Sequence, residues 1–136
     1  MASKVALSAN HRRNLSATLR AIEEAIDEME DVINSSTDEK ITKTVQKDMT
    51  DEERKKIVGG VQQLRSSVNE MFFALGLERR VVSENRFLGA RVTHIWSMLL
   101  DSTPEELKGY GSLPPELASL IEQHLEKMLK IVEGME

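Results

Sequence analysis

The sequence predicts an all-α protein, an antiparallel up-and-down four-helix bundle with a short extra helix in the first long connection. Four segments repeat apolar residues at alternating intervals of three and four, which aligns those residues along one side of a helix. Residues typical of helix starts and ends bound these segments. The 136 residues include only one Trp, one Tyr, three Phe and three Pro, too few β-formers and turn residues for a β-sandwich.

The first helix is expected from near Ser8 to about Asn34. Its apolar stripe consists of Leu15, Leu19, Ile22, Ile26, Met29 and Ile33. Residues 35–50 are too polar for a core and form the connecting segment. Ile41, Val45 and Met49 recur every four residues within it, which predicts the short extra helix.

The second helix is expected to begin after Thr50, which with Glu53 forms a capping-box pattern, and to end at Gly76. Its stripe consists of Ile57, Val61, Leu64, Val68, Met71 and Leu75. Gly59 and Gly60 inside this helix lower its intrinsic stability and predict a bend or the close approach of a neighbouring helix.

The third helix is expected over about Arg79 to Asp101, with a short helical turn at Pro104 and the fourth helix from near Pro114 and Pro115 onward. The core stripe of the third helix is Val81, Leu88, Val92, Ile95 and Leu99, with Asn85 at an inward position. The core stripe of the fourth is Ala118, Ile121, Leu125, Met128, Val132 and Met135. We expect one domain over residues 1–136, with residues 1–7 disordered.

The third and fourth helices carry more apolar surface than one small bundle requires, which indicates an interface. The expected contact residues are Phe87, His94, Trp96, Met98 and Leu120. We therefore expect a non-catalytic interaction or regulatory module that forms a homodimer through its third and fourth helices. A different protein is the other partner that such a surface would suit.

The composition excludes several chemistries. The chain has no Cys, so disulfides, thiolate zinc sites, iron–sulfur ligation and a Cys nucleophile are absent. No histidine lies in a Glu-x-x-His pair, which argues against a di-iron bundle. No nucleophile elbow or phosphate loop occurs, so no catalytic residue and no cofactor are assigned. The net charge of −5 makes nucleic acid an unlikely partner, and the sequence has no apolar run long enough for a signal peptide or a membrane span, so a cytoplasmic location is expected.

An acidic cluster in the first helix supports a competing hypothesis. Glu23, Asp27 and Glu30 lie on one side of the helix beside its apolar stripe. The adjacent Glu23 and Glu24, followed by Asp27, resemble the magnesium-binding motif of all-α nucleoside triphosphate pyrophosphatases. The resemblance implies an Mg²⁺-dependent hydrolase with Glu23, Asp27 and Glu30 as metal ligands. The Glu-x-x-Asp motif that this family carries on a later helix is missing from the second and third helical segments.

Arginines supply a third hypothesis. In an up-and-down bundle, eight of the nine arginines fall towards one end. Arg79, Arg80 and Arg86 are the candidate ligands for an anion, a nucleotide or RNA, because guanidinium groups bind phosphates in a bidentate manner. Acidic residues nearby offer the alternative that the arginines form intramolecular ion pairs.

Overall fold

The computed structural model describes residues 7–36 and 40–136, and every regular element in these residues is helical. The helices are α1 (Ala9–Asn34), α2 (Asp51–Ala74), α3 (Glu84–Leu100), the short α4 (Pro104–Leu107), the 3₁₀ turn η1 (Lys108–Tyr110) and α5 (Pro115–Met135). The all-α class is therefore confirmed. The contacts divide the chain into two units, one up to Arg79 and one from Arg80 to Glu136. Each unit is a helical hairpin.

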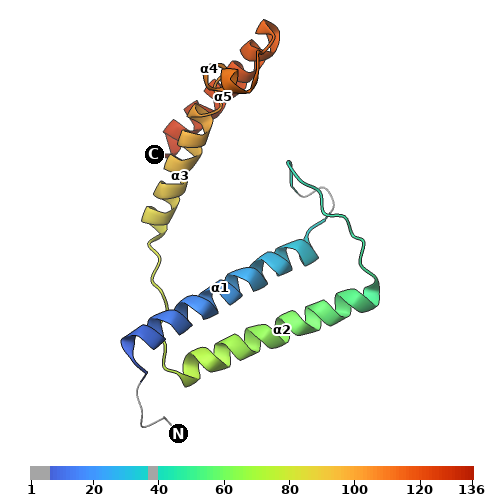
Figure 1. Ribbon diagram of the computed structural model, residues 1–136, viewed down its shortest axis with the longest axis vertical. Coiled ribbons are helices and arrows are strands. Elements are labelled where there is room, and N and C mark those ends of the chain that lie inside the picture. Colours follow the sequence, from blue (N-terminus) through green and yellow to red (C-terminus); the bar gives the residue numbers. More distant parts are fainter. Residues whose placement is uncertain (1–6, 37–39) are drawn as a thin grey trace. The chain divides into compact units, whose positions relative to one another are not determined.

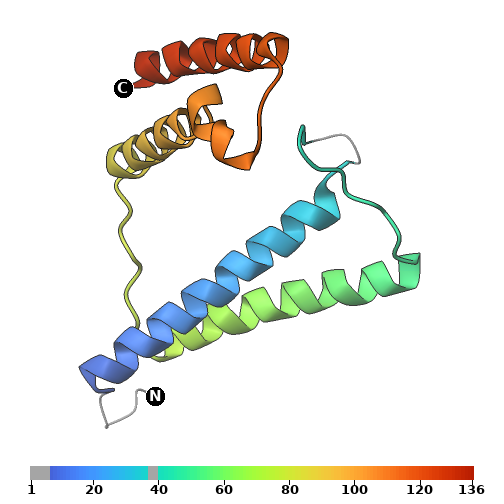
Figure 2. The same cartoon turned by 45° about the horizontal axis from the view of Figure 1, so that its top comes forward.

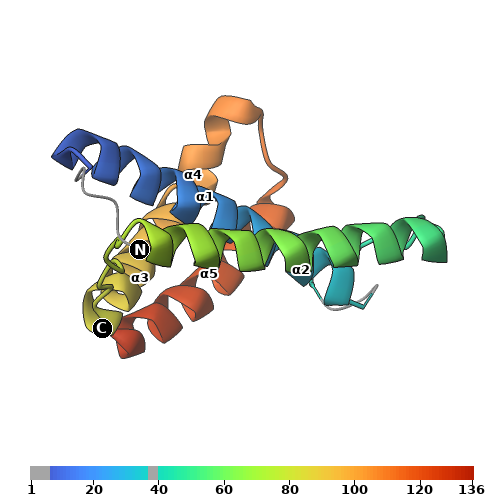
Figure 3. The same ribbon diagram turned by 90° about the horizontal axis from the view of Figure 1, so that it is seen from below.

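The first unit pairs α1 with α2, which lie side by side and run in opposite directions (Figure 1). Figure 3 shows that the two helices are inclined, so that they cross. Leu19 and Ile26 of α1 and Val61 of α2 are buried between them. Ile26 is only 2% exposed, which makes it the most completely buried side chain of the hairpin.

Basic side chains bind both carboxyl ends of this hairpin. Arg12, in the first turns of α1, donates hydrogen bonds to the carbonyls of Leu75 and Gly76 at the end of α2. Lys47 donates from Nζ to the carbonyls of Val32 and Ile33 at the end of α1, at 3.1 and 3.2 Å. The last carbonyls of a helix lack intrahelical donors and carry partial negative charge, so these cations satisfy them.

The start and end of α2 follow the sequence prediction. Thr50 accepts a hydrogen bond from the Glu53 N–H at 3.1 Å, and Glu53 Oε1 accepts one from the Thr50 N–H at 2.9 Å. At the other end, Gly76 has a φ of 62°, a conformation that glycine adopts without strain. The Gly76 and Leu77 N–H groups reach back to the carbonyls of Phe73 and Phe72, and Leu77 is buried.

The capping box predicts a pH-dependent contribution to stability. Hydrogen bonds from the Thr50 N–H, and then from its side chain, hold the pKa of Glu53 below its usual value of 4.5. A carboxyl with a lowered pKa in the folded state stabilises the fold above its unfolded pKa, and that contribution is lost as the pH falls through the folded value.

Thr50→Ala should lower the free energy of unfolding by about 1 kcal/mol at pH 7. Glu53→Gln keeps a hydrogen-bond acceptor but has no carboxyl group to protonate. The free energy of unfolding of this variant should therefore fall less between pH 5 and 3 than that of the wild type. Urea titrations followed by circular dichroism measure both, and an equal acid response of Glu53→Gln and wild type would contradict this role of Glu53.

The second unit pairs α3 with α5, which also run in opposite directions, with α4 and η1 in the connection between them (Figure 2). Val92 of α3 and Leu125 and Val132 of α5 are buried. Thr103 caps α4 by accepting from the Glu106 N–H at 3.4 Å, and Pro104 occupies the first helical position as expected. Pro115 likewise begins α5.

Two expectations about the element boundaries need correction, and a third lies almost wholly outside the described residues. Residues 40–49 contain no helix, and Ile41 is fully exposed. β-branched residues have low helix propensity, so a short helix in this segment would not be stable without extensive packing. The third helix begins at Glu84 rather than Arg79, because Ser83 caps it by accepting from the Arg86 N–H. Val81 therefore lies outside the helix and is exposed. The expected disorder of residues 1–7 concerns, except for Leu7, residues outside those described.

The packed side of α2 also differs from the predicted stripe. The buried and half-buried positions of this helix are Arg54, Val58, Gly59, Gly60, Val61, Arg65, Val68 and Phe72. Ile57, Leu64 and Met71 of the predicted stripe are exposed. A Cβ atom added at Gly59 or Gly60 would meet no atom within 4 Å, so no neighbouring helix approaches the glycines closely in the described residues. The predicted stripe counted only apolar residues and therefore placed the packed side of α2 incorrectly. The aliphatic part of the Arg65 side chain also belongs to that side and packs against α1.

Candidate protein-interaction surface

The five predicted contact residues are all exposed. Phe87, His94, Trp96 and Met98 lie on α3, and Leu120 lies on α5. The α3 side that contacts α5 carries Val92 and Leu99, so Phe87 and Met98 lie on nearly the opposite side of the helix. The guanidinium of Arg91 stands 4.9 Å from the centre of the Phe87 ring, a cation–π contact that covers part of the ring. Trp96 is 38% exposed and lies on the other edge of the α5 contact.

A second apolar surface lies on α5 and includes part of the predicted core stripe. Met128 and Met135 were expected inside, but they are 42% and 60% exposed. Together with four further exposed residues, they form a line along α5 that we call the α5 seam. The α5 seam consists of Leu117, Leu120, His124, Met128, Ile131 and Met135, all of them exposed. A second, separate line on α5 packs against α3 and consists of Ala118, Ile121, Leu125, Leu129 and Val132, all buried or half-buried.

Leu88 and Ile95 extend the α5 seam onto α3. In an antiparallel pair, positions displaced in the same rotational sense from the contact line fall on the same face of the hairpin. Counted at 100° per residue, Leu88 and Ile95 are rotated about the axis of α3 away from Val92. Met128 is rotated about the axis of α5 away from Leu125 in the same direction. Both are exposed, at 53% and 40%. One face of the α3–α5 hairpin is therefore apolar across both helices and is left uncovered within its unit.

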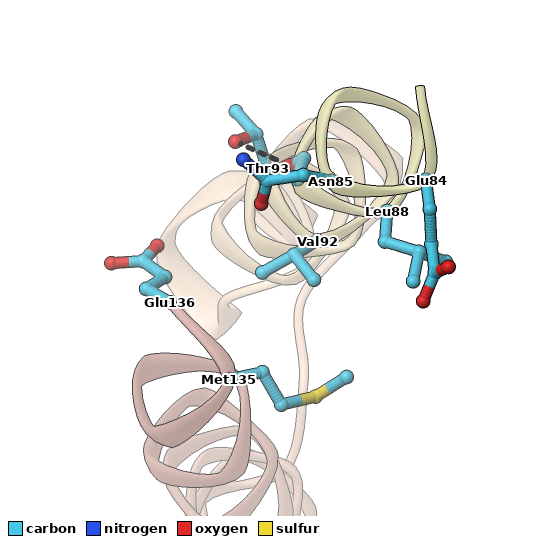
Figure 4. A pocket seen from close by; sticks show the side chains of 8 residues that line it. Glu84, Asn85, Leu88, Val92, Thr93, Met135 and Glu136 are labelled. Atoms are coloured by element: carbon cyan, nitrogen blue, oxygen red, sulfur yellow. Dashed lines mark hydrogen bonds between the residues drawn. The ribbon is translucent and has the colours of Figure 1, made fainter. Parts of the chain in front are cut away.

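An open groove marks the end of this unit, where α3 begins and α5 ends. Its volume is about 710 Å³, and Leu88, Val92 and Met135 supply its apolar lining (Figure 4). Glu84 and Glu136 stand at its two rims (Figure 4). Asn85, expected at an inward position, is exposed and also lines this groove. The expectation was wrong because α3 begins only one residue before Asn85, where α5 no longer covers the helix.

The acidic side chains proposed as magnesium ligands have a different partner. Arg65 of α2 binds Asp27 at 2.9 Å and also binds Glu30. These hydrogen bonds, first to Asp27 and then to Glu30, raise the pKa of Arg65. Glu23 is exposed, and the described residues contain no group of three or more His, Cys, Asp or Glu side chains placed to hold a metal ion. The arrangement is an ion-pair network that links α1 to α2 at its surface.

Several arginines also have partners within the chain. Arg12 binds carbonyls, Arg65 binds carboxylates and Arg91 stacks on Phe87, so three of the arginines assigned to the anion-binding end have intramolecular partners. Arg79 and Arg80 lie in the segment that links α2 to α3, and Arg86 lies in the first turn of α3; all three are exposed. Anion binding by these three side chains stays a prediction.

Comparisons with known proteins return no match for this chain among protein-family models, curated proteins or solved structures. In the parts of the chain that the structure describes, no helix combines the length and apolar character required to cross a membrane. The helices define an all-α protein, and its exposed surfaces are the basis for a functional proposal.

Proposed function

We propose that the protein is a non-catalytic helical interaction module that acts by self-association, with α3 and α5 as its contact surface. The observation that carries this proposal is the apolar face of the α3–α5 hairpin that no helix of the same unit covers. Stable soluble monomers seldom leave contiguous apolar patches of this kind open to water. A homodimer would cover the face, and another protein of similar helical surface is the second partner it would suit.

Methionines support this proposal. All six methionines in the described residues are substantially exposed: Met29, Met49, Met71, Met98, Met128 and Met135. Met has a flexible thioether side chain that adapts to irregular partner surfaces, and it is enriched in protein interfaces. Six exposed methionines in one small chain support a role in partner binding for the helix surfaces that carry them.

The antiparallel four-helix bundle within one chain, which the sequence predicts, is the competing proposal for this face. Each hairpin already contains two antiparallel helices with an apolar face left over, which is half of such a bundle. On the α1–α2 hairpin the uncovered residues include Met29, Ile57, Leu64 and Met71. The single domain over residues 1–136 belongs to the same proposal.

Light scattering of the purified chain tests the proposal. At micromolar concentration we expect twice the mass of one chain. Leu120→Glu places a charge on the α5 seam and should weaken the dimer at least tenfold, because an unpaired charge would have to be desolvated on association. Ser119→Glu makes the same change in charge one residue away, on a side of α5 that faces neither α3 nor the seam, and should leave the mass unchanged.

A monomeric wild-type chain at 100 µM would contradict self-association. Equal weakening by Ser119→Glu and Leu120→Glu would contradict the assignment of the surface, since general charge repulsion would then explain both effects.

A further inference from the structure

The segment that joins the two hairpins contains an unusual pair of arginines. All nine arginines of the chain lie in the described residues, and seven of them belong to helices: Arg12, Arg13, Arg20, Arg54, Arg65, Arg86 and Arg91. Arg79 and Arg80 are the two that lie outside a helix. They belong to residues 78–82, which we call the linker, and the boundary between the two compact units falls between them.

The linker is not helical because its own residues and both of its ends oppose a helix. Gly76 and the buried Leu77 complete the end of α2, and Ser83 caps the start of α3. Between these ends, Val81 and Val82 are β-branched and favour extended backbone over helix. Residues 77–83 accordingly contain no helix or turn, and Figure 2 shows them as an uncoiled stretch of backbone.

The linker is accessible along its whole length. All five of its residues are exposed, and Val81 is 93% exposed. Among the described residues, no hydrogen bond joins the backbone of the linker to another residue, and neither Arg79 nor Arg80 forms an ion pair. The backbone and both guanidinium groups are therefore available to a protein that binds this segment.

These features are those of an endoprotease substrate. Exposed segments between compact units are preferred sites of cleavage, and an uncoiled chain can pair its backbone with that of the enzyme. Proteases that cleave after arginine hold the guanidinium with a carboxylate, because the two groups form a bidentate ion pair. An arginine within a helix can enter such a site only when the helix unfolds locally, so cleavage there depends on a rare open form.

We propose that the linker is a processing site for an endoprotease that cleaves after arginine, and that cleavage ends the covalent connection between the two hairpins. Hydrolysis breaks the C–N bond that follows Arg79 or Arg80. The oxygen of water bonds to the arginine carbonyl carbon, and the nitrogen of the next residue leaves as an amine after taking up a proton. Each hairpin keeps its own buried residues after the cut. The proposal does not depend on self-association, because the linker is not part of the α5 seam.

Digestion of the full chain with an arginine-specific endoprotease tests the site. Mass spectrometry of the early products should find one fragment that ends at Arg79 or Arg80 and a second fragment that begins at the next residue. Cleavage here should be about a hundredfold faster than at any arginine within a helix. Arg79→Gln/Arg80→Gln should abolish these early products.

Arg86→Gln is the matched control, because it removes an exposed arginine from the first turn of α3 and leaves the linker unchanged. This variant should be cut in the linker at the rate of the wild type. Circular dichroism of each variant verifies that its helices are intact. Cleavage within a helix as fast as cleavage in the linker would overturn the proposal.

The chain recovered from the cells that produce it tests whether the site is used. We expect a fragment that begins at Arg80 or Val81, and we expect its loss when Arg79→Gln/Arg80→Gln replaces the wild type in the same cells. Recovery of the uncut chain alone would overturn processing at the linker. An unchanged fragment from the double variant would also overturn it, because the protease would then not recognise these arginines.

Discussion

Replacing Ile26 with alanine should lower the free energy of unfolding by about 2–5 kcal/mol, which is a large part of the stability of a chain of this size. Ile26 is 2% exposed, so the substitution removes buried methyl groups and leaves a cavity between α1 and α2. Met29→Ala removes an apolar side chain of similar size from a position that is 39% exposed, and should cost less than half as much. Urea unfolding followed by circular dichroism measures both values.

Hydrogen exchange of Ile26→Ala adds a second result. Amide protection should fall in α1 and α2, because their shared core loses packing. If a second chain covers the α3–α5 hairpin, as proposed, protection in α3 and α5 should persist. Loss of protection in all four long helices together would instead indicate a cooperative bundle within one chain.

Leu125→Ala should have an effect of the same size on the second hairpin. Leu125 is 7% exposed and packs with Val132 on the side of α5 that contacts α3. The loss should again be about 2–5 kcal/mol, with reduced protection of the α3 and α5 amides. Leu120→Ala is the matched control on the same helix, since Leu120 is 50% exposed.

The comparison of these two leucine variants needs one further condition. Leu120→Ala should cost less than half as much as Leu125→Ala when unfolding is measured at a concentration low enough for the chain to be monomeric. Equal losses would mean that Leu120 is buried within the unit, and the α5 seam would then not be free to bind a partner.

The candidate surface was only partly predictable from the sequence. An excess of apolar residues on the third and fourth helices is visible as a count, and the five predicted residues are indeed exposed. Met128 and Met135 were assigned to the wrong side because α5 carries two apolar lines, and both satisfy the helical period.

The role of the acidic cluster of α1 was also not predictable from local sequence. The spacing of Glu23, Asp27 and Glu30 is compatible with a metal site as long as only α1 is considered. Arg65 lies 35 residues after Glu30 in the sequence, and no local pattern connects them. The antiparallel pairing of α1 and α2 brings the guanidinium to these carboxylates.

By itself the sequence determined the helices and most of their ends, since capping hydrogen bonds, proline positions and helical periodicity act over three to seven residues. Ser8, Thr50, Thr103 and Gly76 each mark a boundary that the structure contains. Only the tertiary structure decided which side of each helix packs within its hairpin. That choice depends on the partner helix, because two apolar lines on one helix bury comparable area and the residues opposite them decide which line packs.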